Sequence, residues 1–372
     1  MEHRFTGPPF TIGIEEELML VDAETLGTAQ GIEDILADDG VSSTARGKVK
    51  PELMQSVLEI CTDPCENLAG AAEQVGHLRR CVAEAAERHG MLVAAAGTHP
   101  WAETEEQLIT DRPRYEELVG ELGWIARQEL IFGTHVHVGV NGADRAIYVA
   151  DGIRRHLPLL LALSANSPLW KGKVTGLLST RAPIFRQFPR VGIPPHYGSW
   201  EIFERRVELM MRAGAIPDYS FLWWDVRTHA NLGTVEIRAF DQQTRLADST
   251  ALAALAICLV HRYVRNFDEG EPMVEVPTEL IDDNKVRAAI HGLEGELIDL
   301  PGDRRAPATD LANELVDELA PDADALGCGV ELGGVRKIIE AGSGAREQLD
   351  FLERGGSQED LMRRLCEQTV LP

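Results

Sequence analysis

The stretch that decides the fold is FTIGIEEELMLV, residues 10–21, in which charged and apolar residues alternate. In a β-strand, residues two positions apart lie on the same face, so Glu15 and Glu17 point in one direction, beside Gly13. The isoleucines and leucines point the other way, together with Glu16, whose charge does not suit an apolar face. The pattern therefore predicts a strand with one face against a hydrophobic core and two carboxylates on the other face.

Two later segments repeat this division into a polar and an apolar face. In ELIFGTHVHVGV, His135 and His137 share a face with two glycines, and in GTVEIRAFD, Glu236 and Arg238 share a face. The simplest explanation is an antiparallel sheet with one face in water. Solvated faces, however, usually carry lysine, serine and threonine, whereas these carry carboxylates, imidazoles and small glycines that leave room for a ligand. We therefore predict a binding site on this face.

A fourth acidic segment, VKPELMQSVLEICTD, contributes Glu52 and Glu59. If the segment is helical, the spacing of the two glutamates puts both on one helical face. If residues 57–62 form a strand instead, Glu59 lies on that strand and Glu52 comes from the preceding loop. The sequence leaves both arrangements open, and a solvated helix is the alternative to a site.

The ion that such a site would hold follows from its donor atoms. Several carboxylates in one concave site cannot all stay ionised unless cations neutralise them. Oxygen-rich sites with one histidine suit Mg²⁺ or Mn²⁺, hard ions that also bind phosphates, whereas His-x-His is a frequent pair of Zn²⁺ ligands. The chain has neither a Gly-x4-Gly-Lys-Ser/Thr loop nor a Gly-x-Gly-x-x-Gly motif. A nucleotide would therefore depend on metal ions and arginines, and the candidates are Arg181, Arg227, Arg238 and Arg245.

The composition excludes several classes of protein. The 372 residues include 36 Lys plus Arg and 60 Asp plus Glu, a net charge of −24, which disfavours binding to nucleic acids and anionic membranes. The longest apolar runs, 157–165 and 251–260, are too short to span a bilayer, and MEHRFTGPPF has no apolar signal core. Six scattered cysteines form no Cys-x-x-Cys pair. We expect a cytoplasmic protein, with a homodimer as the base-rate expectation for its oligomeric state.

The chain reads as one domain, residues 10–372, in which 278–372 is a helical C-terminal appendage because it shows little strand signal. Residues 166–200 are rich in proline, glycine and aromatic residues and show no periodicity, which is typical of a functional stretch. Ser343 and Ser357 are predicted N-caps of the last two helices. The other expected elements are strands at 10–21, 91–96 and 129–140, and helices at 68–90 (capped by Asn67), 144–165, 246–266 and 308–320.

Taken in chain order, a series of short motifs resembles the YbdK-type carboxylate–amine ligases, also called type 2 glutamate–cysteine ligases. The motifs are FTIGIEEELMLVD, VLEICTD, AAAGTHP, FGTHVHVGV, ALSANSPLW, STRAPIF, WWDVRTHANLGTVEIRAFD and GLEGELID. Each motif alone is weakly specific, but the ordered series is highly specific and covers nearly the whole chain. The resemblance implies an α+β, glutamine-synthetase-like domain: a curved, mainly antiparallel sheet with flanking helices and the site on its concave face.

The resemblance also implies an ATP-dependent ligase that joins a small-molecule carboxylate, typically the γ-carboxyl group of glutamate, to an amine such as that of cysteine. The implied ligands of Mg²⁺, or of Mn²⁺ as the alternative ion, are Glu15, Glu17, Glu52, Glu59, His135 and Glu236. Arg238 falls at the transferring phosphate, and His137 matches a companion residue in catalysis or substrate contact. Arg181 and Arg227 fall where contacts to the substrate carboxylate and the nucleotide are expected.

The implied reaction has two steps, in which ATP phosphorylates the carboxylate and the amine then attacks the acyl phosphate. Two alternatives stay open: a Zn²⁺- or Mn²⁺-dependent amide hydrolase, and a ligase for a different amino acid and amine. A non-catalytic protein that binds nucleotide or metal has less support, because every motif acid is retained. Changing Glu15 or Glu236 to glutamine is expected to abolish turnover with little loss of stability, since clustered carboxylates repel one another.

Overall fold

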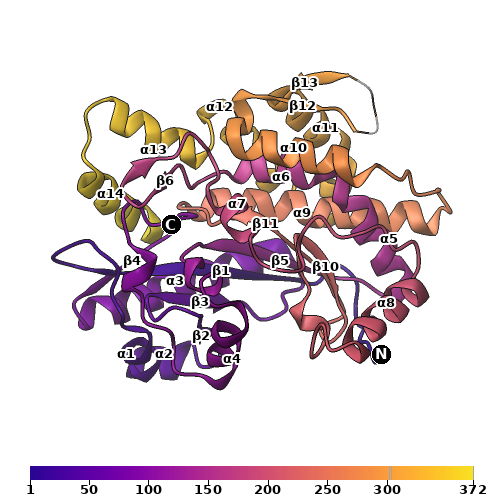
Figure 1. The fold of residues 1–372 in the computed structure, drawn as a ribbon. Coiled ribbons are helices and arrows are strands. Elements are labelled where there is room, and N and C mark those ends of the chain that lie inside the picture. The colour runs from indigo at the N-terminus through magenta and orange to yellow at the C-terminus, as the bar shows by residue number, and fades with distance from the viewer. Residues whose placement is uncertain (301, 303, 372) are drawn as a thin grey trace.

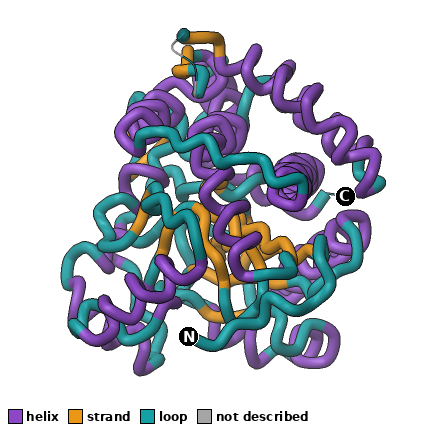
Figure 2. Tube along the Cα trace, turned by 90° about the vertical axis from the view of Figure 1, so that its right-hand side faces the viewer, coloured by secondary structure: helices purple, strands orange, loops and turns teal. Residues whose placement is uncertain are grey.

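A seven-stranded antiparallel sheet occupies the middle of the computed structural model, which describes residues 1–300, 302 and 304–371. The strand order is β10-β11-β5-β1-β3-β2, and β4 (Met91–Ala94) also pairs with β1 (Ile12–Asp22). In Figure 2 the strands lie at the centre with helices around them. The predicted α+β class with a mainly antiparallel sheet is confirmed. Pro372, the last residue of the predicted domain, lies outside the described residues, as do Pro301 and Asp303.

The register of the sheet brings its polar residues together. Along β1 the odd-numbered residues from Gly13 to Glu17 are half-buried and the even-numbered ones are fully buried, as the alternating sequence predicts. Residues directly opposite each other on neighbouring antiparallel strands have Cβ atoms about 5 Å apart. The polar pairs in this position include Glu15 with His135, Glu17 with Glu59, and Glu236 with His137.

The opposite, apolar face of the sheet packs against a layer of helices. α3 (Leu68–Arg88) contacts β1, α9 (Leu246–Asp268) contacts β5 (Gly133–Gly139), and α6 (Leu157–Ser164) contacts β11. Among the described residues, α9 is the one helix long and apolar enough to cross a membrane. The larger part of its most apolar window, 72%, is buried inside the protein, so its composition is accounted for by its place in the core.

Glu16 lies on the apolar face of β1 and is neutralised there by an arginine of α3. Arg79 donates from Nε to Glu16 Oε2 at 2.6 Å and from Nη2 to Glu16 Oε1 at 2.8 Å, and both side chains are almost completely buried. Ser249 of α9 donates to the same carboxylate at 2.5 Å. The remaining donors of Arg79 reach the carbonyl oxygens of Gln243, Thr244 and Thr369. A buried ion pair therefore joins the strand of Glu15 and Glu17 to two helices and the C-terminal segment.

The C-terminal quarter of the chain is mostly helical and packs on the helices already described. α10 (Thr278–His291) contacts α6, and α11 (Ala308–Leu326) and α12 (Gly329–Ala341) contact α9. These helices form the upper part of Figure 1, in orange and yellow. α14 (Gln358–Val370) returns to the sheet and contacts β4. One short hairpin, β12 (Glu296–Ile298) with β13 (Arg305–Pro307), interrupts this region.

The predicted element boundaries needed several corrections. The expected helix 144–165 is divided at Arg154–His156, a 3₁₀ turn before Pro158, which has no N–H for the preceding turn. The strand expected from residue 129 begins at Gly133. Asn67 and Ser357 cap their helices through side-chain hydrogen bonds, but Ser343 makes no such bond.

The other helices and strands are α1 (Ile32–Ala37), α2 (Asp39–Thr44), β2 (Val49–Pro51), β3 (Val57–Cys61), α4 (Pro113–Leu122), α5 (Ala143–Ile153), β6 (Leu169–Trp170), β7 (Lys173–Val174), α7 (Arg181–Phe185), β8 (Val191–Gly192), α8 (Trp200–Arg212), β9 (Trp223–Trp224), β10 (Val226–His229), β11 (Thr234–Asp241) and α13 (Gly344–Glu353).

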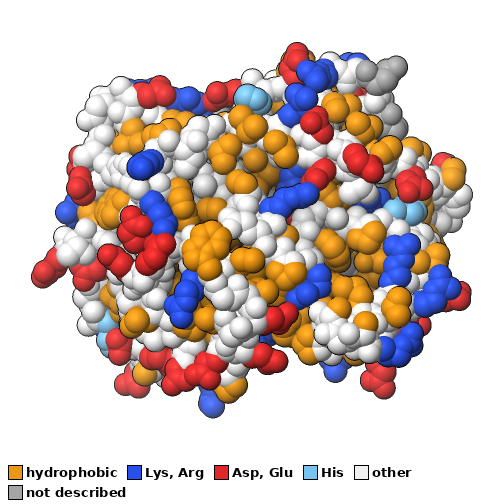
Figure 3. Space-filling view, viewed as in Figure 1, with side chains coloured by type: hydrophobic (Ala, Val, Ile, Leu, Met, Phe, Trp, Pro, Cys, Tyr) orange, Lys and Arg blue, Asp and Glu red, His pale blue; other side chains and the backbone are white. Residues whose placement is uncertain are grey.

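The surface agrees with the low basic content of the chain. On the face viewed in Figure 3, acidic and basic side chains are interspersed, and no continuous basic area is visible. This distribution gives no electrostatic footprint for a nucleic acid on that face.

Candidate active site

The polar faces of the central strands line a cavity of about 340 Å³. Two arrangements were open for the fourth acidic segment. The structure has the second one: Glu59 lies on the strand β3, and Glu52 lies in the loop before it. The predicted residues in the cavity wall are Glu15, Glu17, Glu52, Glu59, His135, Arg227 and Arg238. Arg181 lines a smaller adjoining cavity of about 30 Å³. Arg245 lies elsewhere and pairs with Asp248 and Glu347.

Two groups of potential metal ligands meet at Glu15. One consists of Glu15, Glu59 and His135, the other of Glu15, His137 and Glu236, and within each group the ligand atoms lie within 4.8 Å of one another. The Nε2 atoms of both histidines are buried and have no hydrogen-bond partner among the described residues. A buried polar atom without a partner is costly, and a cation would satisfy it. The donor set, mainly oxygen with one imidazole per group, therefore fits Mg²⁺ or Mn²⁺.

The two other predicted metal ligands lie at the edge of these groups. Glu17 Oε2 accepts a hydrogen bond of 2.5 Å from the backbone N–H of Gly133. Glu52 follows β2 and is half-buried in the cavity wall. Both carboxylates face the same cavity as Glu59, but neither belongs to the two groups of closely spaced donors.

Glu236 is held between two arginines. Its Oε2 accepts 2.5 Å from Arg227 Nε and its Oε1 accepts 2.5 Å from Arg238 Nη1. Burial would raise the pKa of Glu236, but Arg227 and Arg238 outweigh it and hold that pKa well below the ordinary value. Glutamine at this position would leave two buried guanidinium groups without a counter-charge, so the expectation of unchanged stability applies to Glu15 and not to Glu236.

The N–H groups of Arg227 are largely used in hydrogen bonds within the protein. Arg227 also donates from Nη1 to the carbonyl oxygens of Ser220 and Leu222, at 2.9 and 3.0 Å. Most of its N–H groups are thus used to hold Glu236 and the preceding loop. Arg238 differs, because its buried Nε has no partner among the described residues and remains available to a ligand.

The other carboxylates of the cavity have raised pKa values. Burial raises the pKa of Glu17 to about 7, and burial together with the charges of Glu59 and Glu17 raises the pKa of Glu52. The pKa of Glu59 is raised by burial and by Glu15. Burial, followed by the charge of Glu17, raises the pKa of Glu129 to about 8. Without a cation these carboxylates therefore hold their protons to higher pH than exposed ones do, and a divalent ion would favour their ionised forms.

The two histidines of β5 differ in charge. Burial, and then the positive charge of Arg238, lowers the pKa of His135 to about 4, so its imidazole is neutral at pH 7 and keeps a lone pair for a metal. Burial also disfavours the charged form of His137, but Glu236 and Glu15 outweigh it and raise the pKa of His137. Two positions on the same face of one strand thus provide a neutral donor and a group that holds its proton to higher pH.

Two glycines of β5 make room for the protein itself rather than for a ligand. A Cβ atom on Gly133 would lie 2.3 Å from Nη2 and 2.8 Å from Cζ of Arg181. A Cβ on Gly139 would lie 2.4 Å from Thr11 Oγ1. The expectation that these glycines leave space for a ligand is therefore corrected: Gly133 accommodates the guanidinium group of Arg181 against the sheet. Only a residue without a side chain permits this approach.

Sequence reasoning missed three charged residues of the cavity, one of which is Arg114 of α4. Glu129 lies just before β5 and lines both cavities, and its odd number, shared with His135 and His137, was a signal that it belongs to the polar face. Lys50 lies directly opposite Glu59 in the β2–β3 pairing, which no sequence pattern reveals. Aromatic side chains complete the wall on the side of α7 and β9: Phe185, Phe188, Phe221 and Trp223.

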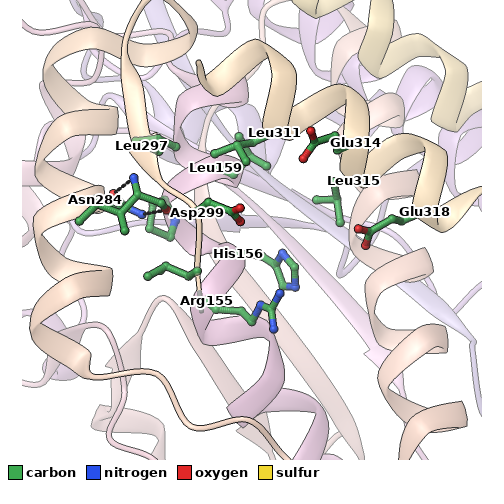
Figure 4. A pocket seen from close by; sticks show the side chains of 13 residues that line it. Arg155, His156, Leu159, Asn284, Leu297, Asp299, Leu311, Glu314, Leu315 and Glu318 are labelled. Carbon is green, nitrogen blue, oxygen red and sulfur yellow. Dashed lines mark hydrogen bonds between the residues drawn. The ribbon is translucent and has the colours of Figure 1, made fainter. Parts of the chain in front are cut away.

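A second cavity, of about 90 Å³, lies between α6, α10 and α11 (Figure 4). The acidic side chains drawn there already have basic partners. Asp299 and Glu314 pair with Arg304, and Glu318 pairs with Arg262. His156 donates to or accepts from Tyr263 Oη at 2.9 Å. The larger cavity is therefore the candidate active site.

Similarity to known proteins shows the family of this chain. The model of glutamate–cysteine ligase family 2 (GCS2) matches residues 11–368. This chain belongs to that family. It is 44% identical over 371 residues to the "Putative glutamate--cysteine ligase 2-3" of Rubrobacter xylanophilus, covering 100% of both chains. It is 40% identical to a relative from Sorangium cellulosum named "Putative glutamate--cysteine ligase 2", covering 97% of this chain and 96% of that one.

Solved structures of this family's fold are similar as well. The glutamate–cysteine ligase of Francisella tularensis in complex with AMP has a TM-score of 0.71 at 14% identity, covering 100% of this chain and 91% of that one. A bifunctional glutathione synthetase from Pasteurella multocida has a TM-score of 0.70 at 16% identity, covering 97% of this chain and 52% of that one. The family predicted from the ordered motifs is confirmed by the family model, and the predicted fold by the structural likeness.

Proposed function

We propose that this chain is an ATP-dependent ligase that joins the γ-carboxyl group of glutamate to the amino group of cysteine through an acyl phosphate. The observation that carries the proposal is the meeting of two groups of oxygen-rich donors at Glu15, directly beside the guanidinium group of Arg238. Transfer of a phosphoryl group needs positive charge around the phosphate oxygens, from metal ions and arginines, and little else from the protein.

The metal would be Mg²⁺, held by Glu15, Glu59 and His135 and by Glu15, His137 and Glu236, with Glu17 and Glu52 beside them. Bound there, it would neutralise charge on the triphosphate and on the developing acyl phosphate. Arg238, whose Nε has no partner among the described residues, would stabilise charge on the transferred group, and Glu236 fixes the orientation of that guanidinium group. Arg227 holds Glu236 in turn.

Arg181 supports recognition of the carboxylate substrate. Its Nε is buried without a partner among the described residues, and its guanidinium group lies against Gly133 in the smaller cavity. A carboxylate ligand would satisfy this donor. The amine loses a proton as the C–N bond forms, and a carboxylate of the same face would accept it, or His137 where its imidazole is not bound to the metal. The aromatic wall limits the access of water to the acyl phosphate.

The test is release of ADP and phosphate by the purified chain supplied with ATP, Mg²⁺, glutamate and cysteine. We expect release to require all components and to yield the γ-glutamyl amide, detected by mass spectrometry. Glu15→Gln should abolish turnover, whereas Glu24→Gln, the same change in an exposed turn, should not. Turnover by Glu15→Gln close to that of the unchanged chain would refute the assignment of the metal ligands.

Two further reactant sets separate the alternatives. A panel of other carboxylates and amines, with the same ADP readout, identifies a ligase with a different substrate pair. Amide hydrolysis in the absence of ATP would support the Zn²⁺- or Mn²⁺-dependent hydrolase instead. Separate assays with each reactant omitted distinguish amide formation from simple ATP hydrolysis.

A further inference from the structure

Lys50 contacts two of the carboxylates assigned to the metal. Its Nζ lies 3.0 Å from Glu59 Oε1 and 3.9 Å from Glu15 Oε1. Lys50 belongs to the edge strand β2, where its Cα lies directly opposite that of Glu59. The backbone of Lys50 is therefore held in register with the site, while 47% of its side chain is exposed to solvent.

Three arginines near the proposed metal ligands pair with other acids, and a fourth, Arg114, lies over the ring of Phe221. Arg227 and Arg238 pair with Glu236, and the guanidinium group of Arg181 lies 4.0 Å from Asp241. Within the described part of the chain, Lys50 is the only Lys or Arg that forms an ion pair with Glu59. Because several carboxylates crowd this side of the cavity, one ammonium group between two of them removes much of their repulsion.

We propose that Lys50 is a tethered counter-ion that neutralises Glu15 and Glu59 in the metal-free protein and releases them when a divalent cation binds. The inference rests on the proposed metal site. A divalent ion held by Glu15, Glu59 and His135 would lie within a few ångströms of the Lys50 ammonium group, and the two positive charges repel. The exposed edge of the sheet gives the long lysine side chain a path into solvent.

Two opposite effects follow from this exchange. Lys50 stabilises the metal-free fold, because it offsets repulsion between the two carboxylates. It also weakens metal binding, because the ion must first displace the ammonium group. A residue that merely braced the sheet would produce the first effect without the second.

The experiment compares Lys50→Met with Lys48→Met, a matched loss of one positive charge. Lys48 is on the same chain segment, but it pairs with Asp63, which does not line the cavity. Mn²⁺ binding is measured by isothermal titration calorimetry without nucleotide or substrate. We expect Lys50→Met to bind Mn²⁺ about tenfold tighter than the unchanged chain, and Lys48→Met to change affinity by less than about twofold, because screening weakens the more distant charge.

Thermal unfolding provides a second measurement. Without metal, Lys50→Met should unfold at a lower temperature than the unchanged chain, and saturating Mn²⁺ should raise its unfolding temperature by more. Lys50→Arg keeps the charge and should retain the original Mn²⁺ affinity to within about threefold. If Lys50→Met does not fold, Lys50→Gln takes its place in both measurements.

Mn²⁺ binding by Lys50→Met that is equal to or weaker than that of the unchanged chain would overturn the inference. If the unchanged chain binds no Mn²⁺, both the metal site and the role of Lys50 are refuted. If Mn²⁺ binds as expected but no carboxylate and amine are joined, the proposed ligase function fails and the role of Lys50 stands.

Discussion

Replacing Arg79 by methionine tests how strongly the buried ion pair stabilises the strand that carries the proposed site. Methionine fills a similar volume but leaves the Glu16 carboxylate, which has no exposed surface, without its two bonds from the guanidinium group. It also removes donors from three backbone carbonyl groups, those of Gln243, Thr244 and Thr369. Of the side chains that the structure describes, Ser249 alone would still donate to the carboxylate.

Removing one partner of a buried ion pair costs about 3–5 kcal/mol, because the remaining charge is uncompensated. For a chain of this length, that loss lowers the unfolding temperature by roughly 4–6 °C. Urea denaturation followed by circular dichroism measures the free energy of unfolding directly. The double variant Glu16→Leu with Arg79→Met removes both charges and should recover most of the lost stability, since apolar replacement of a buried pair is often close to neutral.

The reasoning would be refuted by a loss of less than about 1 kcal/mol in Arg79→Met, which is the size expected for an exposed pair. A double variant no more stable than Arg79→Met would equally contradict it, since the unpaired charge would not then be the cause. Activity offers a further check, because Glu15 and Glu17 flank Glu16 on β1. We expect Arg79→Met to lose activity as well as stability.

Three other perturbations have definite expected outcomes. Gly133→Ala should displace the Arg181 guanidinium group by about 1 Å and lower the free energy of unfolding by about 1–3 kcal/mol, measured by urea denaturation. It should also lower kcat/KM about 100-fold. Unchanged kinetics would show that the position of Arg181 against Gly133 is not needed for activity. Burial lowers the pKa of His99 to about 4, so the unfolded chain binds an extra proton between pH 6.5 and pH 4 and stability falls as the pH drops through that range. His99→Asn should make that fall shallower by about 1.5 kcal/mol between pH 6.5 and pH 5, and an unchanged slope would contradict the assignment. Arg238→Lys should reduce kcat at least about 100-fold with a normal unfolding curve, because an ammonium group lacks the planar fork; near-full kcat would exclude Arg238 from phosphoryl transfer.

Hydrogen bonds act together with burial to keep His99 unprotonated. Its Nε2 donates to the carbonyl oxygen of Leu26 at 3.0 Å, and its Nδ1 accepts from the N–H groups of Trp101 and Ala102. A proton on Nδ1 would place a donor against two donors. The sequence AAAGTHP contains no indication of this arrangement, because all the partners are backbone groups whose positions depend on the fold.

Alternation of charged and apolar residues was sufficient to predict the central strands and the face on which Glu15, Glu17, His135 and Glu236 lie. That inference needs only the two-residue period of a strand and the cost of burying charge. The helices were also predictable where apolar residues recur and a cap is present, as at Asn67. The boundaries of the elements were less predictable. One expected helix is divided just before Pro158, and the strand of His135 begins four residues later than expected.

The sequence by itself therefore determined the sheet, its polar face and the family of the chain, because these depend on periodicity and on local motifs. Tertiary structure alone decided which charges meet. The partner of Glu16 comes from a helix 63 residues away, the partner of Glu59 from a neighbouring edge strand, and Arg181 reaches the sheet over a glycine 48 positions earlier. Electrostatic energy depends on distance in space, and the pairing of strands and the packing of helices set that distance.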